Sequence, residues 1–167
     1  MKAIVYTSNA ETTKEYAEML GEKTGLPVYS ASQANRKVSP GDEIIYLGWL
    51  MAGSIKGYKE AAKIYRIAAV CAVGIRATGS QVDETRKKNK LPKDLPLFTL
   101  QGGFDINKLS GVYKIMMNTM IKTGGKKLAE KEDRTPDEDS VLDMMMNGGN
   151  HVSEENLEDV MEWYEGR

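Results

Sequence analysis

The stretch AIVYTSNAETTKEYA (residues 3–17) passes from a short apolar run, through a loop rich in hydroxyl groups, into a helical pattern. Tyr16 and Leu20 fall on one face of the expected helix 12–24, and Gly25 follows as a C-terminal cap signal. A strand that leads directly into a helix is the first unit of a chain that alternates between the two.

Short apolar runs recur along the chain and alternate with helical patterns. Most of them are continuously apolar, which is typical of strands covered on both faces. The expected strands are 3–6, 26–29, 43–47, 68–73 and 95–100. The expected helices are 12–24, 57–67, 81–90, 106–122 and 153–164, with a short Met-rich piece at 141–146. This alternation predicts an α/β fold with a parallel sheet of order 2-1-3-4-5 and a crevice at the carboxyl ends of its first and third strands.

The composition is that of an ordinary globular domain, with 41% hydrophobic and 28% charged residues. The net charge of −1 argues against a general nucleic-acid binder. The one cysteine, Cys71, is expected to be a buried strand residue, and the one histidine, His151, has no partner at metal-ligand spacing. We therefore expect no metal site. The first apolar run is too short for a signal peptide, and no run reaches the roughly 18 residues of a membrane span, so the cytoplasm is the expected location.

The loop after the first strand has the residue types of an anion site. A helix N-terminus offers unpaired N–H groups, and hydroxyl side chains add donors. The pattern Tyr-x-Ser-x-x-x-x-Thr resembles the phosphate loop of flavodoxins, Ser/Thr-x-Thr-Gly-x-Thr, which wraps the phosphate of FMN. The resemblance implies that a phosphate would lie against Thr7, Ser8, Asn9, Ala10, Glu11, Thr12 and Thr13.

Two departures from the flavodoxin pattern leave a second interpretation open. Ala10 stands where a hydroxyl residue is usual, and Glu11 stands where glycine is usual. A positive φ at Glu11 would cost about 1 kcal/mol. In addition, Ser8 with Glu11 and Thr12 with Glu15 each fit a capping box, which would account for the hydroxyl groups without any ligand.

Two further loops are expected at the same crevice, and the resemblance implies that they border the flavin ring. Trp49 is the aromatic candidate for contact with the ring, and a glycine at position 53 would let the backbone approach it. Arg76 is a candidate to stabilise an anionic flavin or a phosphate, although a surface arginine is an equal alternative. The implied ring-site residues are Trp49, Leu50, Met51, Ala52, Gly53, Gly74, Ile75 and Arg76.

The region from about 105 to 150 exceeds what a minimal five-unit fold needs. We interpret it as an enlarged helical crossover within a single domain that spans residues 1–167. Four stretches in and just before this region resemble the protoporphyrinogen-oxidase branch of the flavodoxin-like group. They are Leu100-Gln101-Gly102-Gly103-Phe104-Asp105, Leu109-Ser110, Tyr113-Lys114-Ile115-Met116-Met117 and Thr123-Gly124-Gly125. Members of that branch carry a comparable insert. Residues Met144, Met145 and Met146 cannot all face one core, which indicates a soft apolar surface.

The leading hypothesis is therefore an FMN-binding, flavodoxin-like three-layer sandwich that transfers electrons or acts as an oxidoreductase, with protoporphyrinogen-like substrates implied by the resemblance. Its partner would be a redox protein or a flat apolar molecule such as a quinone or a porphyrin. The Met-rich insert could equally meet a second copy of the chain or a membrane surface. The alternative hypothesis is a flavodoxin-fold interaction module that no longer binds flavin, and Ala10 and Glu11 favour it.

Overall fold

A computed structural model describes residues 1–109 and 111–167 of the protein and has a mostly parallel central sheet. The strands occur in the order β2-β1-β3-β5-β6. They are β1 (Ala3–Thr7), β2 (Val28–Ser30), β3 (Glu43–Met51), β5 (Arg66–Gly74) and β6 (Leu97–Gln101), all paired in parallel. The short β4 (Ser54–Ile55) pairs only with β3 and runs antiparallel to it. When β4 is set aside, the order is the predicted 2-1-3-4-5.

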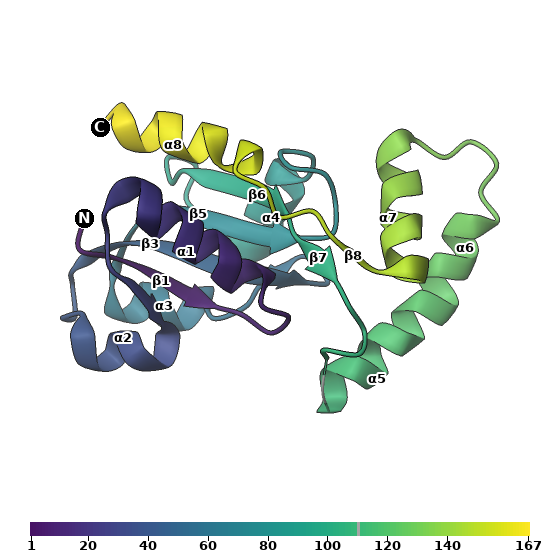
Figure 1. The fold of residues 1–167 in the computed structure, drawn as a ribbon, viewed down its shortest axis with the longest axis horizontal. Coiled ribbons are helices and arrows are strands. Elements are labelled where there is room, and N and C mark those ends of the chain that lie inside the picture. Colours follow the sequence, from purple (N-terminus) through teal and green to yellow (C-terminus); the bar gives the residue numbers. More distant parts are fainter. Residues whose placement is uncertain (110) are drawn as a thin grey trace.

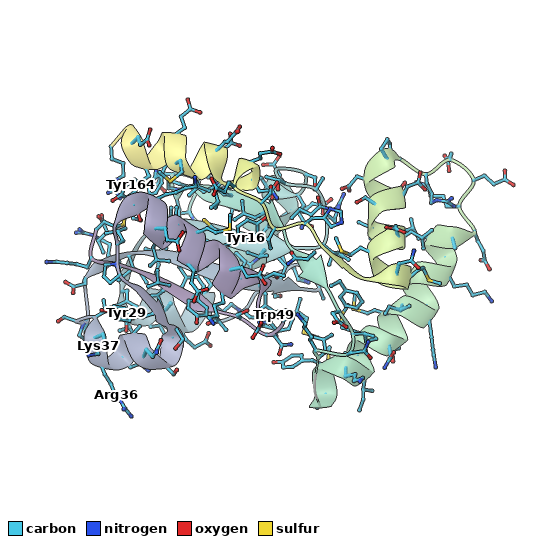
Figure 2. All side chains as sticks on the ribbon, viewed as in Figure 1. Tyr16, Tyr29, Arg36, Lys37, Trp49 and Tyr164 are labelled. Carbon is cyan, nitrogen blue, oxygen red and sulfur yellow. The ribbon has the colours of Figure 1, made fainter. Side chains whose placement is uncertain are left out.

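Helices cover both faces of the sheet and make a flavodoxin-like three-layer sandwich (Figure 1). On one face, α1 (Thr12–Thr24) and α8 (Glu158–Glu165) bury Tyr16, Leu20 and Val160 against Ile45 and Cys71. The other face carries α2 (Ala31–Lys37), α3 (Tyr58–Ile64) and α4 (Val82–Asn89). Figure 2 shows Tyr16 and Tyr164 on the first side and Tyr29 on the side of α2. The strands are thus buried on both faces, as their continuous apolar runs predicted.

Cys71 lies in the middle of β5 and is fully buried. Burial disfavours the thiolate and raises the pKa of this thiol to about 12. The prediction of a buried strand residue is confirmed, and the raised pKa disfavours the thiolate, which is the nucleophilic form.

Several element boundaries differ from the predicted ones for local reasons. Helix α2 was not predicted from the sequence, yet Ser30 caps it in a capping box with Gln33. The predicted helix 57–67 was too long, because β5 begins at Arg66. The last helix, predicted from residue 153, begins later, as a 3-10 turn, η2 (Glu155–Leu157), before α8.

The enlarged crossover between β6 and α8 is a helical arm that projects from the end of the sheet opposite the two termini (Figure 1). Its segments are β7 (Gly103–Phe104), α5 (Gly111–Met120), the π-helical turn η1 (Ile121–Gly125), α6 (Lys126–Ala129), α7 (Pro136–Asn147) and β8 (Gly149–Asn150). Strands β7 and β8 pair antiparallel and close the base of the arm. We call residues 103–150 the insert.

The insert is more helical than its sequence predicted. The expected helix 106–122 begins later, at Gly111, and the helical path continues through η1 and α6 to Ala129. Ser110, part of the similarity to the oxidase branch, lies outside the described residues. The expected short piece 141–146 is a longer helix that begins at Pro136, because Thr135 and Glu138 form a capping box there.

The insert has a small core of its own. Phe104, Leu109 and Met144 are buried together, and Ala10 and Ile75 of the main domain pack against them. The insert is therefore fixed to the loops at the carboxyl ends of β1 and β5. Within the described residues, none of the helices combines the length and the apolar character that a bilayer-spanning helix needs.

Candidate functional site

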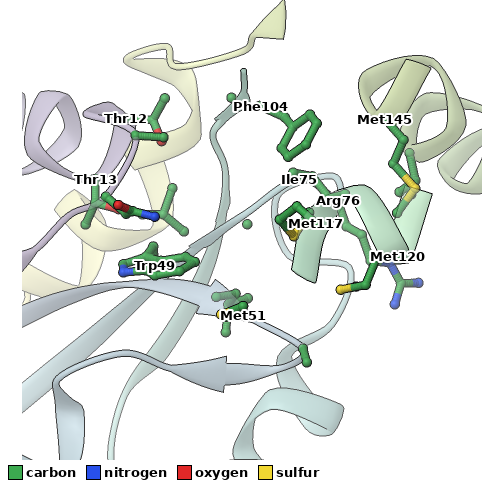
Figure 3. A pocket seen from close by; sticks show the side chains of 18 of the residues that line it. Thr12, Thr13, Trp49, Met51, Ile75, Arg76, Phe104, Met117, Met120 and Met145 are labelled. Atoms are coloured by element: carbon green, nitrogen blue, oxygen red, sulfur yellow. The ribbon is translucent and has the colours of Figure 1, made fainter. Parts of the chain in front are cut away.

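A cavity of about 240 Å³ lies where the main domain meets the insert, at the carboxyl ends of β1, β3 and β5 (Figure 3). This is the crevice that the strand order predicted. It brings together twelve of the predicted site residues, Asn9, Ala10, Thr12, Thr13, Trp49, Leu50, Met51, Ala52, Gly53, Gly74, Ile75 and Arg76. Three others, Thr7, Ser8 and Glu11, do not line it and border a shallower hollow on the side of α2.

The loop after β1 contains a cluster of buried polar atoms that have no hydrogen-bond partner within the described residues. They are Ser8 Oγ, Asn9 Nδ2 and Thr13 Oγ1. Thr13 is only 1% exposed, so its hydroxyl is closed off from bulk solvent. An unsatisfied buried polar group costs about 1–3 kcal/mol, and three of them in six residues indicate that this loop is shaped to hold a polar ligand.

The start of α1 adds to this cluster, because no side chain caps it. Both predicted capping boxes are absent. The N-cap residue is Glu11, which has φ 67° and therefore cannot place a side-chain oxygen over the first turn, and Thr12 is already inside the helix. The first-turn N–H groups of a helix lack intrahelical acceptors and carry the positive end of its dipole. Thr12 N–H donates to the Ala10 carbonyl at 2.9 Å, so the first-turn amides that lack an acceptor among the described residues are those of Thr13 and Lys14.

Glu11 takes the left-handed conformation that the flavodoxin pattern gives to glycine, at the predicted cost of about 1 kcal/mol. Its side chain is exposed and borders the hollow beside α2, outside the cavity. Its carboxylate therefore lies on the side of the loop that borders this hollow and does not line the cavity.

The Thr7 hydroxyl takes part in a hydrogen bond within the main domain. The Tyr46 hydroxyl lies 2.8 Å from Thr7 Oγ1 and 2.7 Å from the Lys56 carbonyl oxygen. Burial raises the pKa of Tyr46 to about 12, so this hydroxyl stays protonated. Gly57 permits the contact, because a Cβ on it would lie 2.2 Å from the Tyr46 hydroxyl oxygen. The role expected for Thr7 against a phosphate has no support from this geometry.

The predicted second loop, residues 48–54, is mostly strand. β3 continues to Met51, turns at Ala52 and Gly53, and returns as β4, with Leu50 opposite Ile55. Ala52 has φ 47° and Gly53 has φ 76°, which is the two-residue hairpin turn whose central residues both need positive φ. The Ile55 N–H donates to Asn89 Oδ1, and Asn89 Nδ2 donates to the Gly53 carbonyl. Because Asn89 is a buried residue of α4, these two bonds hold the hairpin against that helix. This wall of the cavity is therefore attached to α4 through Asn89.

Trp49 lies on this wall, below Thr13 in the close view (Figure 3). Its ring meets Tyr113 of α5 edge to face, with 5.3 Å between ring centroids. Lys56 Nζ lies 5.7 Å from the centroid of the Tyr113 ring. The sequence pattern identified Trp49 but gave no indication that the insert would supply its aromatic partner.

Arg76 also lines the cavity, but its guanidinium is bound by acidic side chains. Nε donates to Asp137 Oδ2 at 2.9 Å, and Nη1 lies 3.3 Å from Glu84 Oε2. The Ala77 N–H donates to the other Asp137 oxygen at 3.1 Å. Asp137 of α7 therefore ties the insert to the loop after β5 and neutralises the charge that was expected to face a ligand.

The far wall of the cavity comes from the insert and was not included among the predicted site residues. Met117, Met120 and Met145 approach from the side opposite Thr12, Thr13 and Trp49 (Figure 3). Phe104, Leu109 and Val141 complete this apolar wall. The Met and Leu residues at helical spacing were the available signal, but helical spacing does not tell which surface a helix covers.

The cavity therefore has one polar end and a larger apolar slot. The polar end offers hydroxyl, amide and backbone donors, which suit an oxyanion. The slot has an indole on one side and thioethers on the other, which suit a flat, polarisable ring. Across residues 1–109 and 111–167, no group of three or more acidic, His or Cys side chains is arranged to hold a metal ion.

No family model, curated protein or solved structure matches the chain.

Proposed function

We propose that the protein binds FMN in this cavity and acts as a flavodoxin-like redox protein. The observation that carries the proposal is the group of unpartnered donors at the uncapped start of α1, placed at one end of a slot walled by Trp49. FMN has a matching shape, because it joins an anionic phosphate to a flat tricyclic ring. The strand order places the cavity at the switch point where open α/β sheets bind ligands.

The polar end would hold the phosphate. Thr13 Oγ1 and Asn9 Nδ2 would donate to it from side chains, and the first-turn amides that follow Thr12 would donate from the backbone. Hydrogen bonds to a charged group contribute about 1.5–3 kcal/mol each. Because Ala10 supplies no hydroxyl and packs against the insert core, the backbone amides would carry much of the binding.

The apolar slot would hold the ring and exclude water from it. Bound FMN supplies one- and two-electron chemistry, which the chain itself does not provide. Trp49 would contact the ring from the β3 side, and the backbone at Gly53 and Gly74 would border it. With the Arg76 charge neutralised by Asp137, the surroundings of the ring would be nearly uncharged.

The apolar insert wall indicates the kind of redox partner. Met117, Met120 and Met145 are soft, adaptable side chains that accept flat apolar molecules. We therefore propose a quinone-like or porphyrin-like electron partner, in line with the oxidase branch that the sequence resembles. A redox protein is the other candidate partner.

The second candidate function is an interaction module without flavin, and one observation favours it. Glu11 keeps the strained φ of the loop while adding a negative charge close to the proposed anion site. The absorption spectrum of the purified protein separates the two functions. We expect the two-banded spectrum of a bound flavin after FMN is added and the excess is removed. A colourless protein after this treatment would favour the module.

Replacing Trp49 by alanine is expected to weaken FMN binding by at least about tenfold, because an aromatic contact adds about 0.5–1.5 kcal/mol beyond its buried area. Isothermal titration of the apoprotein measures the change. Trp163→Ala is the matched control, since Trp163 packs on Phe98 and near Arg167, away from the cavity. Equal losses of FMN affinity in the two variants would mean that Trp49 does not contact FMN.

Replacing Glu11 by glycine is expected to stabilise the apoprotein by up to about 1 kcal/mol and to tighten FMN binding by about fivefold at low salt. Lys90→Gly is the matched control, because Lys90 is exposed, has φ 53° and lies at the end of α4. It should gain similar stability with no change in affinity. If Glu11→Gly leaves the affinity unchanged, the carboxylate exerts no repulsion on the ligand.

A further inference from the structure

Helix α5 carries apolar side chains both toward the cavity and toward solvent. Its inner face contributes Met117 and Met120 to the cavity. Its outer face exposes Val112 at 67%, Ile115 at 68% and Met116 at 44%. The apolar surface of α5 is therefore wider than the part that the cavity covers, and its exposed part is available for a second contact.

The helical segment 111–129 is also strongly basic. It carries four lysines, Lys114, Lys122, Lys126 and Lys127, and no acidic residue. The last three are exposed, and Lys122 follows Ile115 by seven residues, about two turns along the same side. The whole chain has a net charge of −1, so this positive charge is local.

The insert has eight acidic residues, all of them outside this segment, and four have an ion-pair partner among the described residues. Asp137, Glu138 and Asp139 of α7 bind Arg76, Lys131 and Arg134 respectively. Of the four segment lysines, only Lys126 has a carboxylate near it among the described residues, and that pair is long, at 3.9 Å to Glu130. The apolar outer face of α5 is therefore flanked by charge that remains available to an anionic partner.

A second copy of the chain does not suit this face. A twofold contact places the same patch against itself, which would bring lysines against lysines. The exposed patch is also small, with three apolar side chains, whereas a standard interface buries about 800 Å² on each partner. A surface that is negative and has an apolar interior suits the face better.

We propose that the outer face of α5 docks on an anionic lipid surface. Val112, Ile115 and Met116 would enter the boundary between headgroups and acyl chains, and the lysines of segment 111–129 would lie at the headgroups. The projecting position of the insert leaves this helix accessible (Figure 1). Docking would bring the helix that supplies Met117 and Met120 to the cavity wall onto the membrane surface.

The test uses the flavin-free protein, so its result is independent of FMN binding. Extruded vesicles of phosphatidylcholine alone, or of equal parts phosphatidylcholine and phosphatidylglycerol, are floated with the protein on a density gradient. We expect binding to the mixed vesicles only, weakening as salt is raised. Each removed lysine charge should lower the partition coefficient by about fivefold.

Two variants and two matched controls locate the contact. The apolar variant combines Val112→Ser with Ile115→Ser. The lysine variant combines Lys122→Glu, Lys126→Glu and Lys127→Glu. Each variant should abolish binding to the mixed vesicles. Ile64→Ser and Lys59→Glu with Lys63→Glu change exposed residues of α3 and should not. The lysine variant touches no buried residue, so it remains informative if the apolar variant does not fold.

Three results would overturn the proposal. One is the absence of the wild-type protein from the floated mixed vesicles. Another is undiminished binding by the lysine variant. The third is a dimer in sedimentation equilibrium that Ile115→Ser dissociates, because it would assign the outer face to a second copy of the chain.

Discussion

Thr13→Val is expected to make the apoprotein more stable and to weaken its binding of FMN at least about tenfold. The two effects have one cause. Thr13 Oγ1 is buried without a partner in the protein, so a methyl group of similar size removes an unsatisfied polar atom and should raise the free energy of unfolding by about 1 kcal/mol. The same change removes a donor to the phosphate, which contributes about 1.5–3 kcal/mol.

Thr24→Val is the matched control for this variant, in the last turn of the same helix. Thr24 Oγ1 donates to the Leu20 carbonyl at 2.7 Å, so its loss should lower stability slightly and leave FMN affinity unchanged. Urea denaturation and isothermal titration measure the two quantities. If Thr13→Val destabilises the apoprotein or binds FMN as tightly as wild type, the loop does not hold the phosphate through Thr13.

Met144→Ala is expected to destabilise the insert by about 2–5 kcal/mol, the range for deleting a large buried side chain. Met144 is 1% exposed and packs with Phe104 and Leu109 in the small insert core. Because this core has few members, the loss should open the insert before the main domain unfolds. Hydrogen exchange measured by mass spectrometry should rise across residues 103–150.

Met146→Ala is the control two residues away. Met146 is 65% exposed, and truncation there should change stability by less than about 0.5 kcal/mol. Equal protection of residues 103–150 in Met144→Ala and wild type would contradict the insert core described here. A rise in exchange that extends over the whole chain would instead mean that insert and main domain unfold as one unit.

The central sheet was predictable because its signals are local and strong. Buried parallel strands need continuous apolar runs, and the sequence marks them at 43–47 and 68–73. The hairpin at Ala52 and Gly53 was missed because Gly48 reads as the end of a strand. In the folded chain, a Cβ at Gly48 would lie 2.6 Å from Ile55, so this glycine makes room for the hairpin rather than ending the strand.

The main-domain side of the site was predictable, and the insert side was not. Loops at the carboxyl ends of parallel strands converge by topology, so Thr13, Trp49 and Ile75 could be placed together from the sequence. Nothing local to Tyr113 or Met117 specifies that they pack over that crevice. Their positions depend on tertiary contacts such as that between Asp137 and Arg76, which are far apart in sequence.

Comparing FMN with riboflavin tests the central claim most directly, because the two ligands share the ring and differ by the phosphate. Isothermal titration of the wild-type apoprotein with each ligand gives the ratio of their dissociation constants. We expect FMN to bind at least about a hundredfold more tightly, since two or more donors at the start of α1 would contact the phosphate. Equal affinities, or no binding of FMN, would contradict the assignment of this cavity as an FMN site.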